Sequence, residues 1–273
     1  MSGVGRVRAC IMRVGGTNCD AETEVALRDA GAEAEVVHMN KMDRGRLWKY
    51  HILVIPGGFS YGDYVRAGAI WAKRLVVRMG RELEEFVESG RLVLGICNGF
   101  QVLVEAGFLP GFEGRSEVPQ ASLAVNESAS FECRWVYLRN VNRGRCAFTR
   151  LIKEGAVLRM PVAHIEGRFI LPKDREGEYL RRMRENDQLV FQYCYEDGRP
   201  AEGRYPYNPN GSLLDIAGIC NPQGNVMGLM PHPERAYFGW QLPDWTRYGE
   251  PPSYGDGLLV FKSAVDYAEK ELV

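Results

Sequence analysis

Short apolar runs alternate with longer amphipathic segments over the first hundred residues, and this alternation constrains the fold more than any other feature of the sequence. Strands are expected at residues 7–14, 34–39, 51–55 and 91–96, and helices at 20–30, 67–88 and 98–106. This order is typical of a parallel sheet with helices on both faces. In such folds, ligands bind beyond the carboxyl ends of the strands.

The second half of the chain has a different pattern, in which short strand-like runs are joined by turns rich in Gly, Asn and Pro. Strands are expected at 122–125, 131–139, 157–162, 169–171, 189–195 and 213–219, followed by a closing helix at 258–272. These strands could extend the first sheet in antiparallel fashion. The prediction is therefore an α/β fold, with a mostly parallel sheet flanked by helices and an antiparallel extension, in one domain over residues 1–273.

Composition and charge exclude several classes of protein. The 273 residues are 45% apolar and 25% charged, which is ordinary for a globular protein, and a net charge of -1 gives no footprint for nucleic acid or an anionic membrane. The start lacks a signal-peptide core and no apolar run could span a bilayer, so a cytoplasmic protein is expected. Seven scattered cysteines without a C-x-x-C pair, and four histidines, suggest neither a disulfide framework nor a zinc site.

The run GICNGFQ places Cys97 between Gly95 and Gly99, where the predicted strand turns into the predicted helix. This arrangement is typical of a nucleophile elbow, in which flanking glycines prevent collisions at a strained turn. The helix N-terminus favours the thiolate that attacks. The motif alone is weak, because most free cysteines are simply buried thiols. Cys19 lacks such glycines and is interpreted as a structural thiol near a helix start.

The run MPHPER near the end of the chain supplies a candidate base. In an extended chain residues two apart point to the same side, so His232 and Glu234 are expected to lie side by side. Pro233 biases His232 toward the extended region. The carboxylate could then orient the imidazole as a base toward Cys97. Alone, this stretch could equally be a surface His with a solvated Glu, and His164 is the one serious rival as base.

The predicted strand at 51–55 ends in Pro56-Gly57-Gly58, which allows the backbone to approach a ligand closely. The backbone N–H groups of Gly58 and Asn98 are assigned as the two donors of an oxyanion hole. A plain tight turn is the alternative for the glycine pair.

A strand ending in PGG, then GICNGFQ, then a late HPE resembles the class I, triad-type glutamine amidotransferase family, which has a flavodoxin-like fold. The segments PGGFSYGDYVRAGAIWA, PVAHIEGRF and YPYNPNGSLLDIAGICNPQGNVMGLMPHPER are similar, within that family, to glutaminase subunits of phosphoribosylformylglycinamidine synthases of purine biosynthesis. The similarity runs from about residue 7 to residue 235 and resumes in the last helix. The aromatic stretch 237–255 looks like an insertion, and we expect it to be an ordered loop.

The resemblance implies that glutamine is the substrate and that Cys97, His232 and Glu234 release ammonia from it. It also implies that Gln101, one helical turn after Cys97, holds the amino-acid end of the substrate. The ammonia would pass to a synthetase subunit, which uses ATP and Mg²⁺ to make formylglycinamidine ribonucleotide, and a small accessory subunit would complete the complex. No metal or cofactor is expected in this chain.

Other functions stay open at this point. The chain could be a class I glutaminase that serves a different amidation pathway, although the segments FSYGDYVRAG and NPNGSLLDIAGICNPQGN resemble the purine enzyme. It could be a related cysteine hydrolase with the same sheet, but such proteins generally lack the late HPE. A binding module that has lost catalysis is the third alternative, and the intact Cys97, His232 and Glu234 argue against it.

Overall fold

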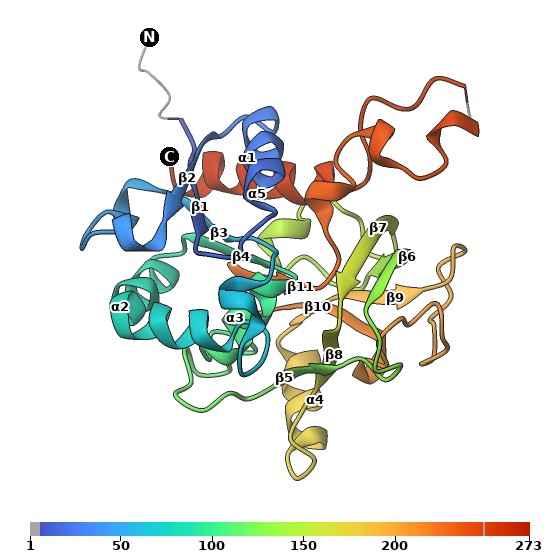
Figure 1. Ribbon diagram of the computed structural model, residues 1–273, viewed down its shortest axis with the longest axis horizontal. Helices are drawn as coiled ribbons and strands as arrows, with labels where there is room; N and C mark the ends of the chain where they lie inside the picture. The colour runs from blue at the N-terminus through green and yellow to red at the C-terminus, as the bar shows by residue number, and fades with distance from the viewer. Residues whose placement is uncertain (1–5, 248) are drawn as a thin grey trace.

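The computed structural model describes residues 6–247 and 249–273, and these build one nine-stranded sheet in the order β2-β1-β3-β4-β11-β10-β9-β6-β7 (Figure 1). The strands are β1 (Arg8–Arg13), β2 (Glu33–His38), β3 (Ile52–Ile55), β4 (Leu92–Ile96), β5 (Ser122–Val125), β6 (Glu132–Asn140), β7 (Val157–His164), β8 (Glu166–Ile170), β9 (Leu189–Cys194), β10 (Ile216–Cys220) and β11 (Val226–Leu229). The helices are α1 (Asp20–Asp29), α2 (Ala69–Glu88), α3 (Asn98–Glu105), α4 (Glu176–Glu185) and α5 (Leu258–Glu271).

The first half of the sheet is parallel, as the sequence predicts. Strands β2, β1, β3, β4 and β11 pair in parallel. Helices α1 and α5 lie on one face of these strands and α2 and α3 on the other (Figure 1). Because both faces are covered, every residue of β3, β4 and β11 is buried.

The second half of the sheet is antiparallel, which confirms the predicted extension. Strand β11 pairs antiparallel with β10, and β10, β9, β6 and β7 follow in the same manner. The prediction was wrong for two of its segments, because β5 and β8 leave the large sheet and pair with each other. It was also wrong over the first part of 213–219, where Leu213–Asp215 form a short 3-10 turn with left-handed Leu214 and Asp215.

Helix α2 is fixed against the layer that carries the candidate nucleophile. Its buried side chains recur every three or four residues along one face, as expected of an amphipathic helix. They include Trp71, Leu75, Leu83 and Phe86. Gly68 precedes the helix with φ 76°, and a Cβ at this position would lie 2.9 Å from the backbone nitrogen of Val102 in α3. The two helices can therefore approach closely at this point.

Residues 237–255 form an arm that leaves the body after the HPER segment and returns at α5 (upper right in Figure 1). Tyr237 is buried at its base, where Phe238 and Tyr254 form an isolated bridge. Farther out, Asp244 forms an ion pair with Arg159 of β7 at 3.0 Å. Tyr248 lies outside the described residues. The rest of this segment is thus tied to the body at both its base and its outer part.

Among the described residues, no helix combines the length and the apolar character needed to cross a membrane.

Candidate active site

Cys97 occupies a strained turn between β4 and α3. Its backbone has φ 50° and ψ -105°, a conformation that costs a non-glycine residue about 1–3 kcal/mol. A Cβ on Gly95 would lie 2.6 Å from the carbonyl oxygen of Gly99, and a Cβ on Gly99 would overlap the carbonyl of Ile55. Only glycine fits at either position. The elbow geometry expected from the sequence is therefore present.

Long-range pairing brings the end of β11 to this elbow. The N–H of Cys97 donates to the carbonyl of Leu229, the last residue of β11, at 2.8 Å. Three residues farther on, the N–H of His232 donates to the carbonyl of Pro161 in β7 at 2.8 Å. The candidate base is therefore held between the parallel half of the sheet and its antiparallel extension.

His232 and Glu234 form the buried pair that the sequence predicts. The ring nitrogen Nδ1 lies 2.6 Å from Oε1 of Glu234, and both side chains are at most 2% exposed. The expected extended chain is wrong beyond His232, because Pro233–Arg235 form a 3-10 turn. Proline favours the first position of such a turn, since its φ is already fixed. The turn still brings the carboxylate to the imidazole.

The electrostatics of the pair suit a group that takes and returns a proton. Burial alone would lower the pKa of His232, but the Glu234 carboxylate, and then the Cys97 sulfur, raise this pKa well above its ordinary value. With Nδ1 held by the carboxylate, the other nitrogen, Nε2, is buried and has no hydrogen-bond partner among the described residues. It is available for proton exchange with a reacting group.

Three of the predicted site residues, Gly58, Cys97 and His232, line one cavity of about 210 Å³. Gly58 has φ 148°, and a Cβ there would lie 2.7 Å from the carbonyl oxygen of Gly16. The position therefore requires glycine. The other residues that line the cavity are Asn18, Cys19, Phe59, Phe131, Cys133, Ala163 and Arg235.

The turn that carries Gly58 has a fixed orientation. The carbonyl of Gly57 accepts hydrogen bonds from the N–H groups of Asn18 at 3.3 Å and Cys19 at 3.2 Å. In a trans peptide the N–H points opposite to the carbonyl, so the N–H of Gly58 is directed away from these donors. The N–H of Asn98 lies in the first turn of α3, where helical geometry supplies no acceptor. The assignment of these two N–H groups as oxyanion donors stays a prediction.

Gln101 lies one turn after Cys97, but its side chain is already bonded within the protein. Its Oε1 accepts from Nδ2 of Asn98 at 2.9 Å, and its Nε2 donates to the carbonyl of Glu166. The side chain is buried and is not among the residues that line the cavity. Its role in holding substrate stays a prediction.

The rival base His164 has a structural environment. Its Nδ1 lies 3.0 Å from Oδ1 of Asn126, and burial followed by the charge of His232 lowers its pKa to about 3. A carboxylate, Glu166, follows two residues later, but the chain turns between them and Glu166 accepts from the N–H of Ala67 instead. His164 therefore lacks the carboxylate partner that orients His232.

Sequence reasoning gave no role in the site to Cys19 or Arg235, which both line the cavity and contact each other. Cys19 does precede α1, as expected, but its Sγ also lies 3.9 Å from Nδ1 of His232 and accepts from Nη2 of Arg235 at 3.1 Å. The contact joins residues 213 positions apart, so no local pattern could have revealed it. Of the described residues, one group can offer three metal ligands at close range: Cys19, His232 and Glu234.

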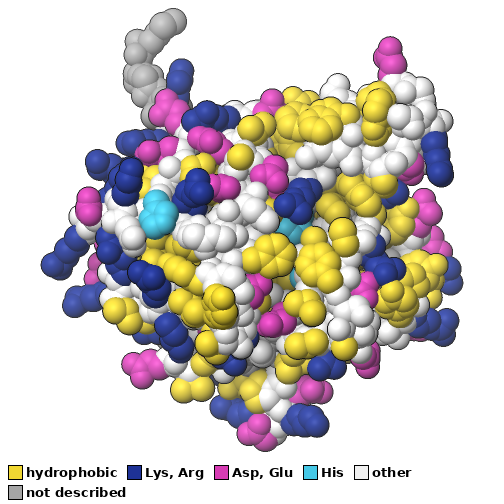
Figure 2. All heavy atoms as spheres, viewed as in Figure 1, with side chains coloured by type: hydrophobic (Ala, Val, Ile, Leu, Met, Phe, Trp, Pro, Cys, Tyr) yellow, Lys and Arg dark blue, Asp and Glu magenta, His cyan; other side chains and the backbone are white. Residues whose placement is uncertain are grey.

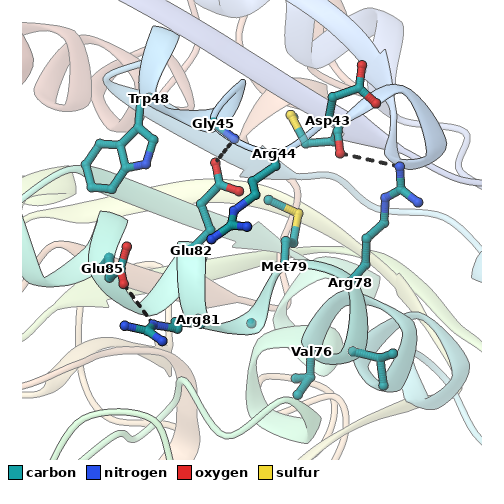
Figure 3. A pocket seen from close by; sticks show the side chains of 13 residues that line it. Asp43, Arg44, Gly45, Trp48, Val76, Arg78, Met79, Arg81, Glu82 and Glu85 are labelled. Atoms are coloured by element: carbon teal, nitrogen blue, oxygen red, sulfur yellow. Dashed lines mark hydrogen bonds and ion pairs between the residues drawn. The ribbon is translucent and has the colours of Figure 1, made fainter.

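A larger hollow of about 750 Å³ lies between residues 42–48 and α2, and it contains none of the predicted site residues (Figure 3). Its charged side chains are largely paired within the protein: Glu82 accepts from the N–H of Gly45, and Arg81 pairs with Glu85. Size alone therefore does not select the candidate site, because the smaller cavity is the one that contains the predicted nucleophile and base.

Comparison with known proteins agrees with this chemistry. Residues 6–268 match the model of the CobB/CobQ-like glutamine amidotransferase domain, and the chain belongs to this family. It is 46% identical to phosphoribosylformylglycinamidine synthase subunit PurQ of Archaeoglobus fulgidus, over 97% of this chain and 98% of that one. It is 40% identical to the PurQ subunit of Dehalococcoides mccartyi, over 98% and 100% of the two chains.

A solved structure supports the same conclusion. The chain superimposes on a chain of the structure of PurLQS from Thermotoga maritima with a TM-score of 0.70 and 32% identity, covering 96% of this chain and 99% of that one. The resemblance to PurQ-type glutamine amidotransferases and the fold expected from it are confirmed.

Proposed function

We propose that this chain is the glutaminase subunit of a phosphoribosylformylglycinamidine synthase and that it hydrolyses glutamine with Cys97, His232 and Glu234. The observation that carries the proposal is the meeting, at one small cavity, of a strained cysteine with a buried His–Glu pair. The names of relatives at 46% and 40% identity supply the pathway.

The first half of the reaction forms a thioester. At rest, the Cys97 thiol lies 3.6 Å from the carbonyl of Ala163. Nε2 of His232 takes the thiol proton as the sulfur attacks the side-chain amide carbon of glutamine, and the carbonyl oxygen becomes an oxyanion between the N–H groups of Gly58 and Asn98. The imidazolium then gives its proton to the amide nitrogen, the carbon–nitrogen bond breaks and ammonia leaves. Glu234 holds the ring throughout.

The second half returns the enzyme. Water replaces ammonia beside His232, which takes a proton from it while the hydroxyl adds to the thioester carbon. The same two backbone donors stabilise the second oxyanion. The carbon–sulfur bond then breaks, the proton returns to the Cys97 sulfur, and glutamate leaves. No redox step or bound metal is needed for this sequence.

The ammonia requires an acceptor, and the proposed partner is the synthetase subunit of the same enzyme. Exposed aromatic rings surround the cavity mouth: Phe59 and Phe131 are 44% and 48% exposed, and their ring centroids lie 6.3 Å apart. Figure 2 shows large hydrophobic side chains gathered in the middle of the face that it views. We propose that the synthetase docks over this rim. The synthetase subunit would use ATP and Mg²⁺. A small accessory subunit would complete the complex, and the assembly would be cytoplasmic.

The test is Cys97→Ala in the assembled enzyme, with either glutamine or ammonium as nitrogen donor. Glutamine-dependent synthesis should fall by at least about four orders of magnitude, while synthesis from ammonium stays within about twofold of the parent. Cys194→Ala, which removes a thiol that does not line the cavity, is the control and should keep both activities. Equal loss with both donors in the Cys97 variant would contradict the assignment.

A further inference from the structure

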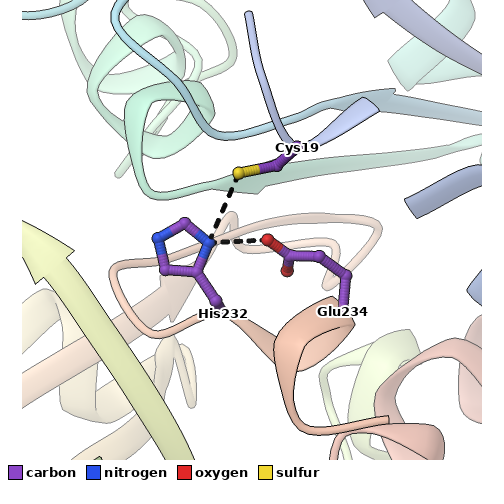
Figure 4. A group of neighbouring side chains, drawn as sticks. All are labelled: Cys19, His232 and Glu234. Carbon is purple, nitrogen blue, oxygen red and sulfur yellow. Dashed lines mark hydrogen bonds and ion pairs between the residues drawn. The ribbon is translucent and has the colours of Figure 1, made fainter. Parts of the chain in front are cut away.

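The cavity contains a second thiol that the glutaminase mechanism does not use. Cys19 lies on the Nδ1 side of His232, opposite the nitrogen that serves Cys97, and Figure 4 shows its sulfur and the Glu234 carboxylate converging on the same ring nitrogen. The distances are 3.9 Å from Sγ to Nδ1 and 2.6 Å from Nδ1 to Oε1. One ligand atom from each side chain lies within 4.8 Å of the other two.

This donor set is the one that zinc prefers. Cysteine sulfur, histidine nitrogen and a carboxylate oxygen bind Zn²⁺ at about 2.3, 2.0 and 2.1 Å, so tetrahedral ligands lie about 3.4–3.6 Å apart. The observed sulfur–nitrogen separation is within a few tenths of an ångström of this. The Nδ1 and Oε1 atoms would have to separate by about 0.8 Å, which a small rotation of the Glu234 carboxylate can supply.

A second observation concerns the other oxygen of the same carboxylate. The other carboxylate oxygen of Glu234, Oε2, is buried and has no hydrogen-bond partner among the described residues. Glu234 is 1% exposed, so water from bulk solvent does not compensate this lone pair. A cation that the Glu234 carboxylate bound through both of its oxygens would satisfy Oε2 as well as Oε1, and Zn²⁺ would be neutralised by the two negative charges of a Cys19 thiolate and this carboxylate.

We infer that Cys19, His232 and Glu234 form an inhibitory zinc site that shares the imidazole with the catalytic machinery. When the metal binds, the Cys19 thiol releases its proton to solvent, and the proton on Nδ1 of His232 is displaced, so that the ring keeps one proton, on Nε2. Zinc occupies Nδ1, so the neutral ring carries its one proton on Nε2, and the ring can no longer accept a proton from Cys97. Glu234 is drawn to the metal at the same time. Glutamine hydrolysis stops until zinc is removed.

Arg235 makes this site reversible rather than permanent. Its guanidinium donates to the Cys19 sulfur at 3.1 Å, so a bound cation would lie beside a fixed positive charge. The cavity supplies the route for entry, because Cys19 and His232 both line it. Among the described residues, no group of three potential metal ligands includes Cys97.

Metal binding can be measured without any assay of catalysis. Co²⁺ replaces zinc as the probe, and the full-length chain is examined for a thiolate-to-cobalt charge-transfer absorption. The band should form in the wild-type protein, in Cys97→Ala and in the control Cys133→Ala. It should be lost in Cys19→Ser, which keeps the size of the side chain but removes the thiolate. A band that disappears in Cys97→Ala and survives in Cys19→Ser, or no band in any protein, would overturn the site.

Inhibition is tested separately, and this part alone rests on the proposed glutaminase function. Glutamate release is measured with increasing Zn²⁺, and each variant is compared with its own rate in chelator. The zinc concentration for half-inhibition should rise at least about tenfold in Cys19→Ser and stay unchanged in Cys133→Ala, since even outer-shell changes cost about 10- to 100-fold in metal affinity. Equal inhibition of Cys19→Ser and wild type would refute the inhibitory role. Absence of glutamate release from the wild type would instead count against the proposed function, with the cobalt result intact.

Discussion

The proposed nucleophile and the proposed base of this protein are held in place by different means. Cys97 takes its conformation from the backbone around it, because Gly95 and Gly99 leave no room for a Cβ. His232 takes its position from bonds to distant groups: its N–H to Pro161 in β7 and its ring to Glu234. We therefore expect the parallel half of the sheet to be intolerant of added atoms, whereas the region around His232 should depend on the chemical nature of its side chains.

The largest effect on activity is expected from a variant that removes a catalytic interaction but keeps the fold. Glu234→Gln keeps the size of the side chain but removes the charge that holds Nδ1 of His232 and raises its pKa. We expect kcat for glutamate release to fall by roughly 10³–10⁴, by analogy with the amide replacement of the buried carboxylate in serine proteases. Steady-state kinetics of the complex measure this.

Glu178→Gln is the control for that experiment, because Glu178 lies on α4 and pairs only with neighbouring arginines there. Its kcat should equal that of the parent. A Glu234→Gln enzyme with kcat within about threefold of wild type would show that the carboxylate does not orient the base.

The second prediction concerns the close packing of the backbone around Cys97. Gly99→Ala places a Cβ onto the carbonyl of Ile55, so β3, β4 and α3 must move apart. We expect a loss of about 3 kcal/mol in the free energy of unfolding, at the upper end for overpacked sites. Denaturant titration followed by circular dichroism measures it.

Gly177→Ala, in the first turn of α4, adds the same methyl group where no heavy atom lies within 4 Å. It should be neutral or slightly stabilising, since alanine favours helix. If both variants proved equally stable, close packing at the elbow would not be what excludes a side chain.

The third prediction concerns the antiparallel region beside the base. The amide of Asn126 donates to the carbonyls of Ser130 and His164 and accepts from the N–H of Gly167. Asn126→Ala leaves these buried groups without partners and should cost about 2 kcal/mol of stability. Thermal unfolding monitors the loss. A change below about 0.5 kcal/mol would mean that water or neighbouring groups replace the amide.

At mildly acidic pH, near 6, the smallest of these effects is a pH dependence of stability that arises from His164. Its folded pKa of about 3 lies below its ordinary value of 6.5, so between these values the unfolded chain binds a proton that the folded protein does not. Stability is therefore lost as pH falls from 6.5, with a slope of at most about 1.4 kcal/mol per pH unit from this group. His164→Gln should remove that contribution. Unfolding of both proteins at several pH values tests this, and parallel curves would argue against a buried neutral His164.

Local interactions explain why much of the fold could be predicted. The helix expected at 20–30 is α1 at Asp20–Asp29, and the strand expected at 91–96 is β4 at Leu92–Ile96. The apolar spacing and the flanking glycines lie within a few residues of each other in these segments. The same holds for Cys97 in its elbow and for His232 with Glu234, because each motif is contained in at most five consecutive residues.

The sequence analysis missed or misplaced elements whose apolar residues are few or whose partner strand is not encoded locally. Helix α4 buries only Tyr179 and Met183, which is one residue per helical turn. This is too few to give a periodic apolar signal in the sequence. Strands β5 and β8 have ordinary strand character, so nothing in either segment shows that they pair with each other rather than with the large sheet.

By itself, the sequence determined the parallel core, the strained position of Cys97 and the pairing of His232 with Glu234, because these depend on neighbours along the chain. The tertiary structure alone decided that β11 lies between β4 and β10, that the Gly57 carbonyl is held by Asn18 and Cys19, and that the Cys19 sulfur meets His232. These contacts join segments far apart in sequence, and the packing of the sheet and its helices, not any local pattern, brings such segments together.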